Sequence, residues 1–286
     1  MNIPNNIQVS VCIVTYNQEK YIAECLESLV TQRTNFSFEI IVGEDCSTDN
    51  TRAIVQKYVD QYPELVIPLF YEKNVGAVEN LQQTYLKAKG KYIAHMDGDD
   101  MALPDKLQKQ FNALEKNTDC VICAHNMILI DDSGRNLSIK NNFDRTEEKI
   151  NWKRYIKKPS TFAHSSKFFL KETLRRKLED KDLDKQTLDF ELHLESLRFG
   201  NILYLEDKLG KYRQLAGVSS NKKIYIIFNR GFFRMFNECF VYYKDKGYIK
   251  SISSYFFFLR MLSALKRKDF SEIYVIFRVV IRNLLK

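Results

Sequence analysis

The sequence lacks several signatures that would place it in a well-known class. It contains neither G-x-G-x-x-G nor G-x-x-x-x-G-K-[ST], which argues against dinucleotide binding and against P-loop nucleotide binding. The opening residues, MNIPNNIQVS, have no basic region followed by an apolar one, and no uncharged apolar run approaches the roughly 20 residues that cross a bilayer. Glycine (10) and proline (5) are few among the 286 residues, which excludes a collagen-like or low-complexity chain. We therefore expect a folded protein that neither spans a membrane nor is secreted.

Charge is distributed unevenly along the chain. The formal net charge is +8, but the last 76 residues hold 16 Lys+Arg and only 4 Asp+Glu, so the preceding part is slightly acidic. Six cysteines in a chain of this length, without a leader sequence, are typical of reduced cytosolic thiols. The expected location is the cytoplasm.

Apolar strand-like runs alternate with amphipathic helical periods through the first 130 residues. Between the runs, apolar residues recur at i, i+3 and i+4, as on the buried face of a helix. This alternation predicts an α/β fold with a mainly parallel, doubly wound sheet, whose ligands bind beyond the carboxyl ends of the strands. The predicted strands cover residues 9–16, 38–42, 65–71, 92–96 and 120–130.

Two acidic turns follow strands of this predicted sheet. EDCSTD (44–49) follows the second strand, and DGDD (97–100) follows the fourth. Carboxylates gathered at one edge repel one another and raise each other's pKa, and a divalent cation removes that conflict. Hard oxygen ligands suit Mg²⁺ or Mn²⁺. A D-x-D pattern also occurs later in a charged stretch, so the position at a strand end, rather than the tripeptide, favours a metal site at Asp97 and Asp99.

The chain resembles the family-two glycosyltransferases of the GT-A fold in four segments that follow one another in order. These are VSVCIVTYNQEKYI, EIIVGEDCSTDNT, the KNVG segment with an asparagine further on, and YIAHMDGDD. The resemblance implies a nucleotide-diphospho-sugar transferase fold in which Asp97 and Asp99 hold the donor diphosphate through Mn²⁺ or Mg²⁺. The nucleotide-sugar contacts that it implies are Thr15, Tyr16, Asn17, Glu44, Asp45, Asn74, Gly76, Asn80, Asp97, Gly98 and Arg213.

The second half of the chain resembles the same family more loosely. LDFELHL (188–194), RFGNILYLE (198–206) and the Tyr-Arg pair that ends at Arg213 are similar to the family's E-D-x-x-L helix, G-x-I-x-Y-L strand and Y-R element. On this register Asp189 takes the position of the catalytic base. An inverting transfer needs such a carboxylate to accept the proton of the acceptor hydroxyl. A solvent-facing position on an amphipathic helix is the alternative for Asp189.

The segment PSTFAH (159–164) resembles the acceptor-side strand and turn of related enzymes. It implies acceptor contacts by Ser160, Thr161 and His164, and an ordinary strand entry is the alternative. The sequence also departs from the family pattern at two positions. Leu188 replaces an acid before Asp189, and Leu215 occupies the position where many relatives have a metal-binding histidine.

From residue 222 onward the pattern becomes helical, aromatic and basic. Arg278, Arg282 and Lys286 recur every four residues and form a polar stripe on an otherwise apolar helix. Such a C-terminal helical segment packs against the rest of the protein or lies on an anionic membrane surface. Nucleic acid is disfavoured, because no nucleic-acid module is recognisable and the acidic front would repel a phosphate backbone.

Together these patterns predict three parts: a nucleotide-sugar-binding half (1–131), an acceptor-binding and catalytic-base half (132–217) and a basic aromatic helical tail (218–286). The expected activity is metal-dependent, inverting transfer of a hexosyl or N-acetylhexosaminyl group. The donor would be a UDP-sugar and the acceptor a glycan or lipid-linked saccharide in surface polysaccharide synthesis, with peripheral attachment to the inner face of the membrane.

Two alternatives remain open. The first is a catalytically inactive member that binds glycans or acts as a scaffold, which Glu44, Leu188 and Leu215 favour as departures from the family pattern. The second is a sugar-nucleotide nucleotidyltransferase, although the chain has TYNQEKY where such enzymes carry a glycine-rich phosphate loop.

Overall fold

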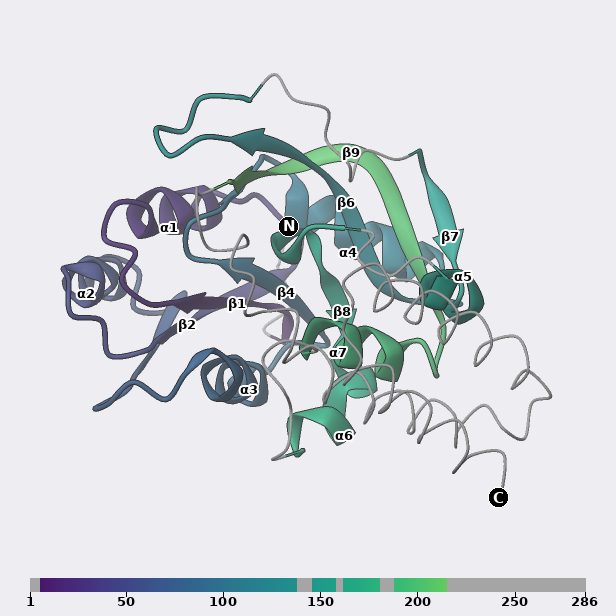
Figure 1. The fold of residues 1–286 in the computed structure, drawn as a ribbon, viewed down its shortest axis with the longest axis horizontal. Coiled ribbons are helices and arrows are strands. Elements are labelled where there is room, and N and C mark those ends of the chain that lie inside the picture. Colours follow the sequence, from purple (N-terminus) through teal and green to yellow (C-terminus); the bar gives the residue numbers. More distant parts are fainter. Residues whose placement is uncertain (1–5, 138–145, 158–161, 181–187, 215–286) are drawn as a thin grey trace, which may run out of the picture.

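A computed structural model describes residues 6–137, 146–157, 162–180 and 188–214, and these residues form a mixed sheet with helices on both faces (Figure 1). The strand order is β3-β2-β1-β4-β8-β6-β9-β5, and β7 pairs with β9. The strands are β1 Ile7–Thr15, β2 Ser37–Glu44, β3 Val66–Phe70, β4 Tyr92–Asp97, β5 Met101–Ala102, β6 Cys120–Ile130, β7 Glu148–Ile150, β8 Phe168–Leu170 and β9 Asn201–Arg213. The α-helices are α1 Ile22–Val30, α2 Thr51–Gln61, α3 Ala77–Lys87, α4 Lys106–Lys116, α5 Trp152–Lys157, α6 Arg175–Leu178 and α7 Leu188–Ser196; the 3₁₀ helices are η1 His164–Ser166 and η2 Lys171–Leu174.

The predicted α/β fold is confirmed. All five predicted strands are present, as β1, β2, β3, β4 and β6. Strands β1 to β4 are parallel, so their carboxyl ends share one edge of the sheet. Among the strands that the sequence pattern missed is β8, a three-residue strand that lies between β4 and β6 and is antiparallel to both. Through β8, the second half of the chain is hydrogen-bonded to the strand that ends in the acidic turn.

The two faces of the sheet bury different residues of each strand. On β4, Tyr92, Ala94 and Met96 pack into a cluster with apolar residues of α1, α2 and α4. Ile93 packs into a second cluster, which contains residues of α3, α6 and α7. Since successive strand side chains point to opposite faces, His95 and Asp97 share the face of Ile93. The alternation thus directs a histidine and a carboxylate toward the side of the sheet that carries α7.

The three-part division of the chain stays a prediction. Strands from 1–131 and from 132–217 belong to one sheet, and the tail at 218–286 lies outside the described residues. Among the described residues, no helix has the length and apolar character to cross a bilayer.

One buried cation beside the sheet bears on stability. Lys106, at the start of α4, is 1% exposed, and its Nζ donates a hydrogen bond to Gln110 Oε1 at 2.8 Å. Burial lowers its pKa from 10.5 to about 8, because the desolvated ammonium is disfavoured. Within the described part of the chain this ammonium forms no ion pair. The folded protein therefore carries an electrostatic cost at neutral pH.

We expect Lys106→Met to stabilise the fold at pH 7 and to lose that advantage in alkali. The folded-state pKa lies below the unfolded value, so the cost is fully present below about pH 8 and disappears as the pH rises toward 10.5. A pKa shift of this size corresponds to a destabilisation of the wild type by about 3 kcal/mol at pH 7. The variant avoids this cost but loses the hydrogen bond to Gln110, which is worth about 1 kcal/mol. Urea unfolding of both proteins at pH 7 and pH 10 measures the difference.

The matched control is Lys109→Met, on the same helix, where Lys109 is exposed and forms a surface ion pair with Asp207. This variant should change the free energy of unfolding by less than about 1 kcal/mol at either pH. An equal stability difference for Lys106→Met at both pH values would contradict the assignment of a buried ammonium.

Candidate active site

The loops after β1 and β2 are held together by side chains that accept or supply backbone hydrogen bonds. The Asn17 amide donates to Ser47 Oγ at 2.9 Å, and Asn17 Oδ1 accepts from the Thr48 amide at 2.8 Å. The Gln18 amide donates to Thr51 Oγ1 at 2.8 Å. Asn17 has a φ of 53°, a left-handed conformation that asparagine tolerates better than most residues. The first two predicted nucleotide-sugar segments therefore form one surface at the carboxyl edge of the sheet.

The carboxylate of Asp45 holds the loop before α3. Its Oδ1 accepts from the Val75 amide at 2.6 Å and its Oδ2 from the Gly76 amide at 3.0 Å. Asn74 Nδ2 donates to the Asp45 carbonyl oxygen at 3.1 Å. Gly76 has a φ of +88°, which only glycine adopts without strain. The predicted residues Asp45, Asn74 and Gly76 are thus brought together, with both oxygens of the carboxylate bonded to the chain.

Glu44 and Asn80 are placed inside the protein. Glu44 is fully buried, and its carboxylate accepts from the Ser47 amide at 2.6 Å and from Arg52 Nε at 2.5 Å. Asn80 is 2% exposed and donates from Nδ2 to the Gly43 carbonyl at 2.9 Å, which ties α3 to β2. The buried side chains of Glu44 and Asn80 therefore stabilise the end of β2 through hydrogen bonds inside the protein.

The acidic turn after β4 concentrates negative charge. Burial and the neighbouring charge of Asp97 raise the pKa of Asp99 to about 6 and raise that of Asp100 well above its usual range. Asp100 is 1% exposed; its Oδ1 accepts from the Arg213 amide at 2.8 Å, and its Oδ2 is buried without a hydrogen-bond partner among the described residues. Desolvated carboxylates in this number fit a divalent cation, because hard oxygens are the ligands that Mg²⁺ and Mn²⁺ take. Asp97 and Asp99 would hold it.

The predicted residues Thr15, Tyr16 and Gly98 lie beside this turn or at the strand end next to it. A side chain at Gly98 would place Cβ 2.8 Å from Thr15 Oγ1 and 2.5 Å from Gln18 Oε1, so only glycine allows the turn to pack against the end of β1. Thr15 is buried, whereas Tyr16 is 45% exposed and offers an aromatic surface at the edge of the sheet.

Arg213, at the end of β9, braces the acidic turn. Its Nε donates to the Asp99 carbonyl at 3.0 Å, and its two terminal nitrogens bind the Asp132 carbonyl at 2.8 Å and Glu24 Oε2 at 2.7 Å. The guanidinium carbon lies 4.5 Å from the centre of the Tyr21 ring. Because each guanidinium nitrogen has a protein partner, the side chain supports the turn in this state; a contact with phosphate remains a prediction.

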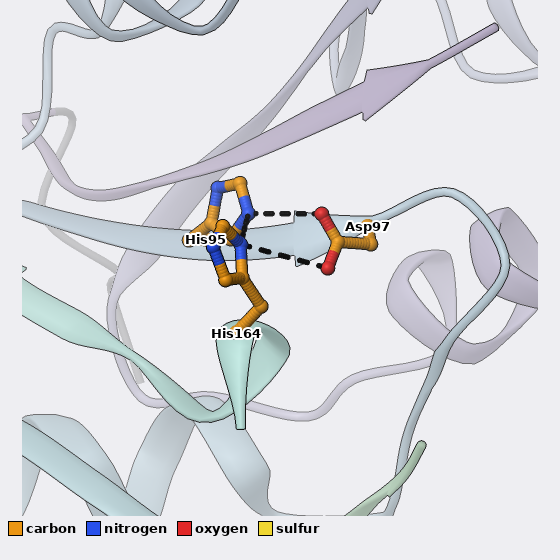
Figure 2. Close-up of side chains that lie close together, drawn as sticks. All are labelled: His95, Asp97 and His164. Atoms are coloured by element: carbon orange, nitrogen blue, oxygen red, sulfur yellow. Dashed lines mark hydrogen bonds and ion pairs between the residues drawn. The ribbon is translucent and has the colours of Figure 1, made fainter. Parts of the chain in front are cut away.

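Two histidines converge on Asp97 from different elements (Figure 2). His95 Nε2 lies 3.1 Å from Asp97 Oδ1, and His164 Nδ1 lies 3.6 Å from Asp97 Oδ2 and 3.0 Å from His95 Nε2. Ser165 Oγ accepts a 2.9 Å hydrogen bond from the Asp97 amide, which fixes η1 against β4. His95 is fully buried, and burial lowers its pKa to about 4, so its imidazole is neutral.

His164 connects this cluster to Asp189. Its Nε2 forms a hydrogen bond with Asp189 Oδ2, and Lys167 Nζ donates to Asp189 Oδ1. Burial alone would lower the pKa of His164, but the charges of Asp189 and Asp97 outweigh it and raise the pKa to about 9. For Asp189, the opposite charges of His164 and Lys167 outweigh burial and hold the pKa well below its usual range. Asp189 is therefore an ionised carboxylate separated from Asp97 by one imidazole ring.

Of the three predicted acceptor residues, one lies in the described part of the chain and two lie outside it. His164 is brought into the site by η1, while Ser160 and Thr161 lie outside the described residues.

His95 and Lys167 are site residues that the sequence interpretation did not include. The strand period was the available signal for His95, since residues two apart on β4 share a face, and no pattern in the sequence singles out Lys167.

Comparison with known proteins identifies the family to which this chain belongs. The model of the family described as Glycosyl transferase family 2 matches residues 10–177, more than half of the chain, and the chain therefore belongs to this family.

The chain is similar to the uncharacterized protein Mb1547 of Mycobacterium bovis, with 29% identity over 211 residues that cover 73% of this chain and 59% of that protein. It is also similar to TuaG of Bacillus subtilis, a protein named for glycosyl transfer in teichuronic acid biosynthesis, with 37% identity over 102 residues, 36% of this chain and 40% of that one. The chain thus spans less than two thirds of these relatives.

A solved structure has the same fold. The crystal structure of S. aureus TarS 1-349 in complex with UDP-GlcNAc matches with a TM-score of 0.61 and 22% identity, over 78% of this chain and 65% of that chain. The predicted GT-A type of fold is thereby confirmed. The predicted site residues keep the status of predictions.

We expect Asp45→Asn to release the loop before α3. In asparagine one of the two carboxylate oxygens is replaced by an NH₂ group, which would face the N–H of Val75 or Gly76 as a second donor, so one charge-assisted hydrogen bond is lost. Hydrogen exchange at these two amides should accelerate by about tenfold or more, as the loss of such a bond predicts. NMR or mass-spectrometric exchange measures it. Asp60→Asn, on the exposed face of α2, is the control and should leave the exchange of this loop unchanged.

Proposed function

We propose that this chain is an inverting glycosyltransferase that moves a sugar from a nucleotide-diphosphate donor to a hydroxyl of a saccharide acceptor. The observation that carries the proposal is the contact chain from Asp97 through His164 to Asp189. It joins an acidic turn suited to a metal and diphosphate with an ionised carboxylate suited to a base. A transferase needs these two groups on opposite sides of the reacting sugar, a few ångströms apart.

The donor is proposed to be a UDP-sugar. The loops after β1, β2 and β3 form a preorganised edge, and Tyr16 presents an exposed ring there on which a base can stack. The relation to the TarS fold, solved with UDP-GlcNAc, supports a uridine nucleotide and a hexosyl or N-acetylhexosaminyl group. The similarity to TuaG supports a role in the synthesis of a surface polysaccharide.

The chemistry assigns one proton transfer to this chain. Asp189 accepts the proton of the acceptor hydroxyl while that oxygen attacks the anomeric carbon from the side opposite the diphosphate. The new glycosidic bond forms, the bond from the anomeric carbon to the diphosphate oxygen breaks, and the electron pair leaves with the diphosphate. Bound Mn²⁺ or Mg²⁺, held by Asp97 and Asp99, would neutralise the charge that develops on the leaving group. His164 and Lys167 occupy one lone pair on each Asp189 oxygen and leave others for the acceptor.

We expect Asp189→Asn to abolish transfer and to leave donor affinity nearly unchanged. An amide cannot take the proton, which removes general-base catalysis worth about 10²–10⁴-fold. A screen of UDP-, GDP- and dTDP-sugars with Mn²⁺, with and without acceptor glycans, identifies the donor from the nucleotide released. The variant is then compared with the wild type in turnover and in UDP affinity by calorimetry.

Asp207→Asn is the control, because Asp207 lies at the surface in an exposed ion pair with Lys109. It should retain full turnover. Loss of UDP binding in Asp189→Asn would show that Asp189 belongs to the donor site instead. Absence of transfer from every donor in the screen, with UDP still bound, would favour the catalytically inactive alternative.

We also propose that the basic tail, residues 218–286, attaches the protein to the inner face of a membrane. The support is its sequence alone, in which cationic residues recur on an otherwise apolar helical pattern. The full chain should float with vesicles that contain anionic lipid and remain unbound with neutral vesicles. Replacing Arg278, Arg282 and Lys286 by Gln should reduce flotation several-fold, since each charge contributes about 1 kcal/mol near the surface. Equal flotation of both proteins would contradict the proposal.

A further inference from the structure

The atoms that surround Asp97 have the spacing of ligands around one metal ion. His95 Nε2, His164 Nδ1 and the Asp97 carboxylate oxygens are separated by 3.0, 3.1 and 3.6 Å (Figure 2). Ligands bonded at about 2.1 Å lie about 3.0 Å apart at a right angle and about 3.4 Å apart at the tetrahedral angle. The three groups come from β4 and η1, which are fixed to one another by the Asp97 amide and Ser165. A single ion can therefore contact both imidazoles and the carboxylate without a rearrangement of the backbone.

The hydrogen bond between His164 and Asp189 orients the first imidazole for this task. With the Nε2 proton directed at Asp189, a cation that displaces the Nδ1 proton would meet the Nδ1 lone pair on the side of Asp97 and His95. A metal-bound histidine almost always donates its other N–H to a carboxylate or carbonyl, which fixes the tautomer and the ring. Lys167 binds the second oxygen of Asp189 and holds that carboxylate in place. Asp189, the proposed base, thus lies where a carboxylate can accept a hydrogen bond from a metal-bound histidine.

The second imidazole is buried and incompletely satisfied. His95 is fully buried, its Nε2 faces Asp97 and His164, and its Nδ1 has no hydrogen-bond partner among the described residues. A single proton on this ring cannot satisfy both nitrogens. Ligation through Nε2 would occupy that nitrogen with the ion and place the ring proton on Nδ1.

We propose that His95 and His164 bind the cation together with Asp97, so that the site selects a first-row transition ion over Mg²⁺. Two imidazoles and one carboxylate suit Mn²⁺, Co²⁺ or Zn²⁺, whereas Mg²⁺ takes oxygen ligands almost exclusively. Asp97 and His164 are 28% and 34% exposed in their side chains, so the site is open to solvent on one side, where a further ligand of the ion can enter. This assignment rests on the proposed function for its role, but the metal site itself can be measured without any substrate.

The test is the spectroscopy and the affinity of metal binding by the full chain after chelator treatment. In Mn²⁺-loaded protein, electron spin echo modulation should show coupling to ¹⁴N of directly bound imidazole. Titration should show Mn²⁺ binding at least about tenfold tighter than Mg²⁺, as nitrogen ligation requires. The variants His95→Gln and His164→Gln should each weaken Mn²⁺ binding by about tenfold or more, reduce the ¹⁴N coupling and change Mg²⁺ affinity much less.

His125→Gln is the matched control. His125 is a fully buried histidine on β6 whose Nδ1 contacts the Asn126 carbonyl, outside this cluster. It should leave the metal affinities and the nitrogen coupling unchanged, and thermal melts of all variants verify that they are folded. Absence of ¹⁴N coupling in the Mn²⁺-loaded wild type, or equal affinity for Mn²⁺ and Mg²⁺, would overturn the proposal and leave the cluster as a hydrogen-bond network.

The two proposals fail separately. Nitrogen-coupled Mn²⁺ without transfer from any donor would support the metal site and reject the transferase activity. Metal-dependent transfer without nitrogen coupling would support the activity and reject the histidine ligands.

Discussion

Compensation of negative charge at the carboxyl end of β4 is the constraint on which the rest of the site depends. Asp97, Asp99 and Asp100 stand in one turn, and their burial is costly unless each charge is paired, hydrogen-bonded or neutralised. The compensating groups come from distant parts of the chain: His164 from η1, and Arg213 from the end of β9. The second half of the protein is therefore tied to the acidic turn by electrostatics as well as by β8.

The donor side of the site is built on a different principle, in which polar side chains satisfy the backbone of loops that have no strand partners. Asp45 accepts from two amides of the loop before α3, and Asn17 links the loops after β1 and β2. Unpaired backbone groups are costly when buried, so these contacts fix the loops without a ligand. Residues whose types suggest ligand binding thus also hold the loops in place through hydrogen bonds.

Much of the fold was predictable, because its signals are local. Apolar runs and the 3.6-residue period identified five strands and the helices between them, and the acidic turns followed directly. The strand β8 was not predictable in the same way, since three residues carry too little period to be recognised, and its pairing with β4 depends on contacts far apart in sequence. Likewise, the period of β4 puts His95 and Asp97 on one face, but it cannot show that His164 and Lys167 meet them there.

The sequence by itself determined the α/β alternation, the edge at which polar residues gather and the identity of the acidic groups, because each of these follows from the order of residues within one short segment. Only the tertiary structure decided how those groups are used. It buried Glu44 against Arg52, occupied the Arg213 guanidinium with protein partners and brought two histidines to Asp97. The physical reason is that pairing, burial and the resulting pKa of a group depend on neighbours supplied by other segments, and packing alone selects those neighbours.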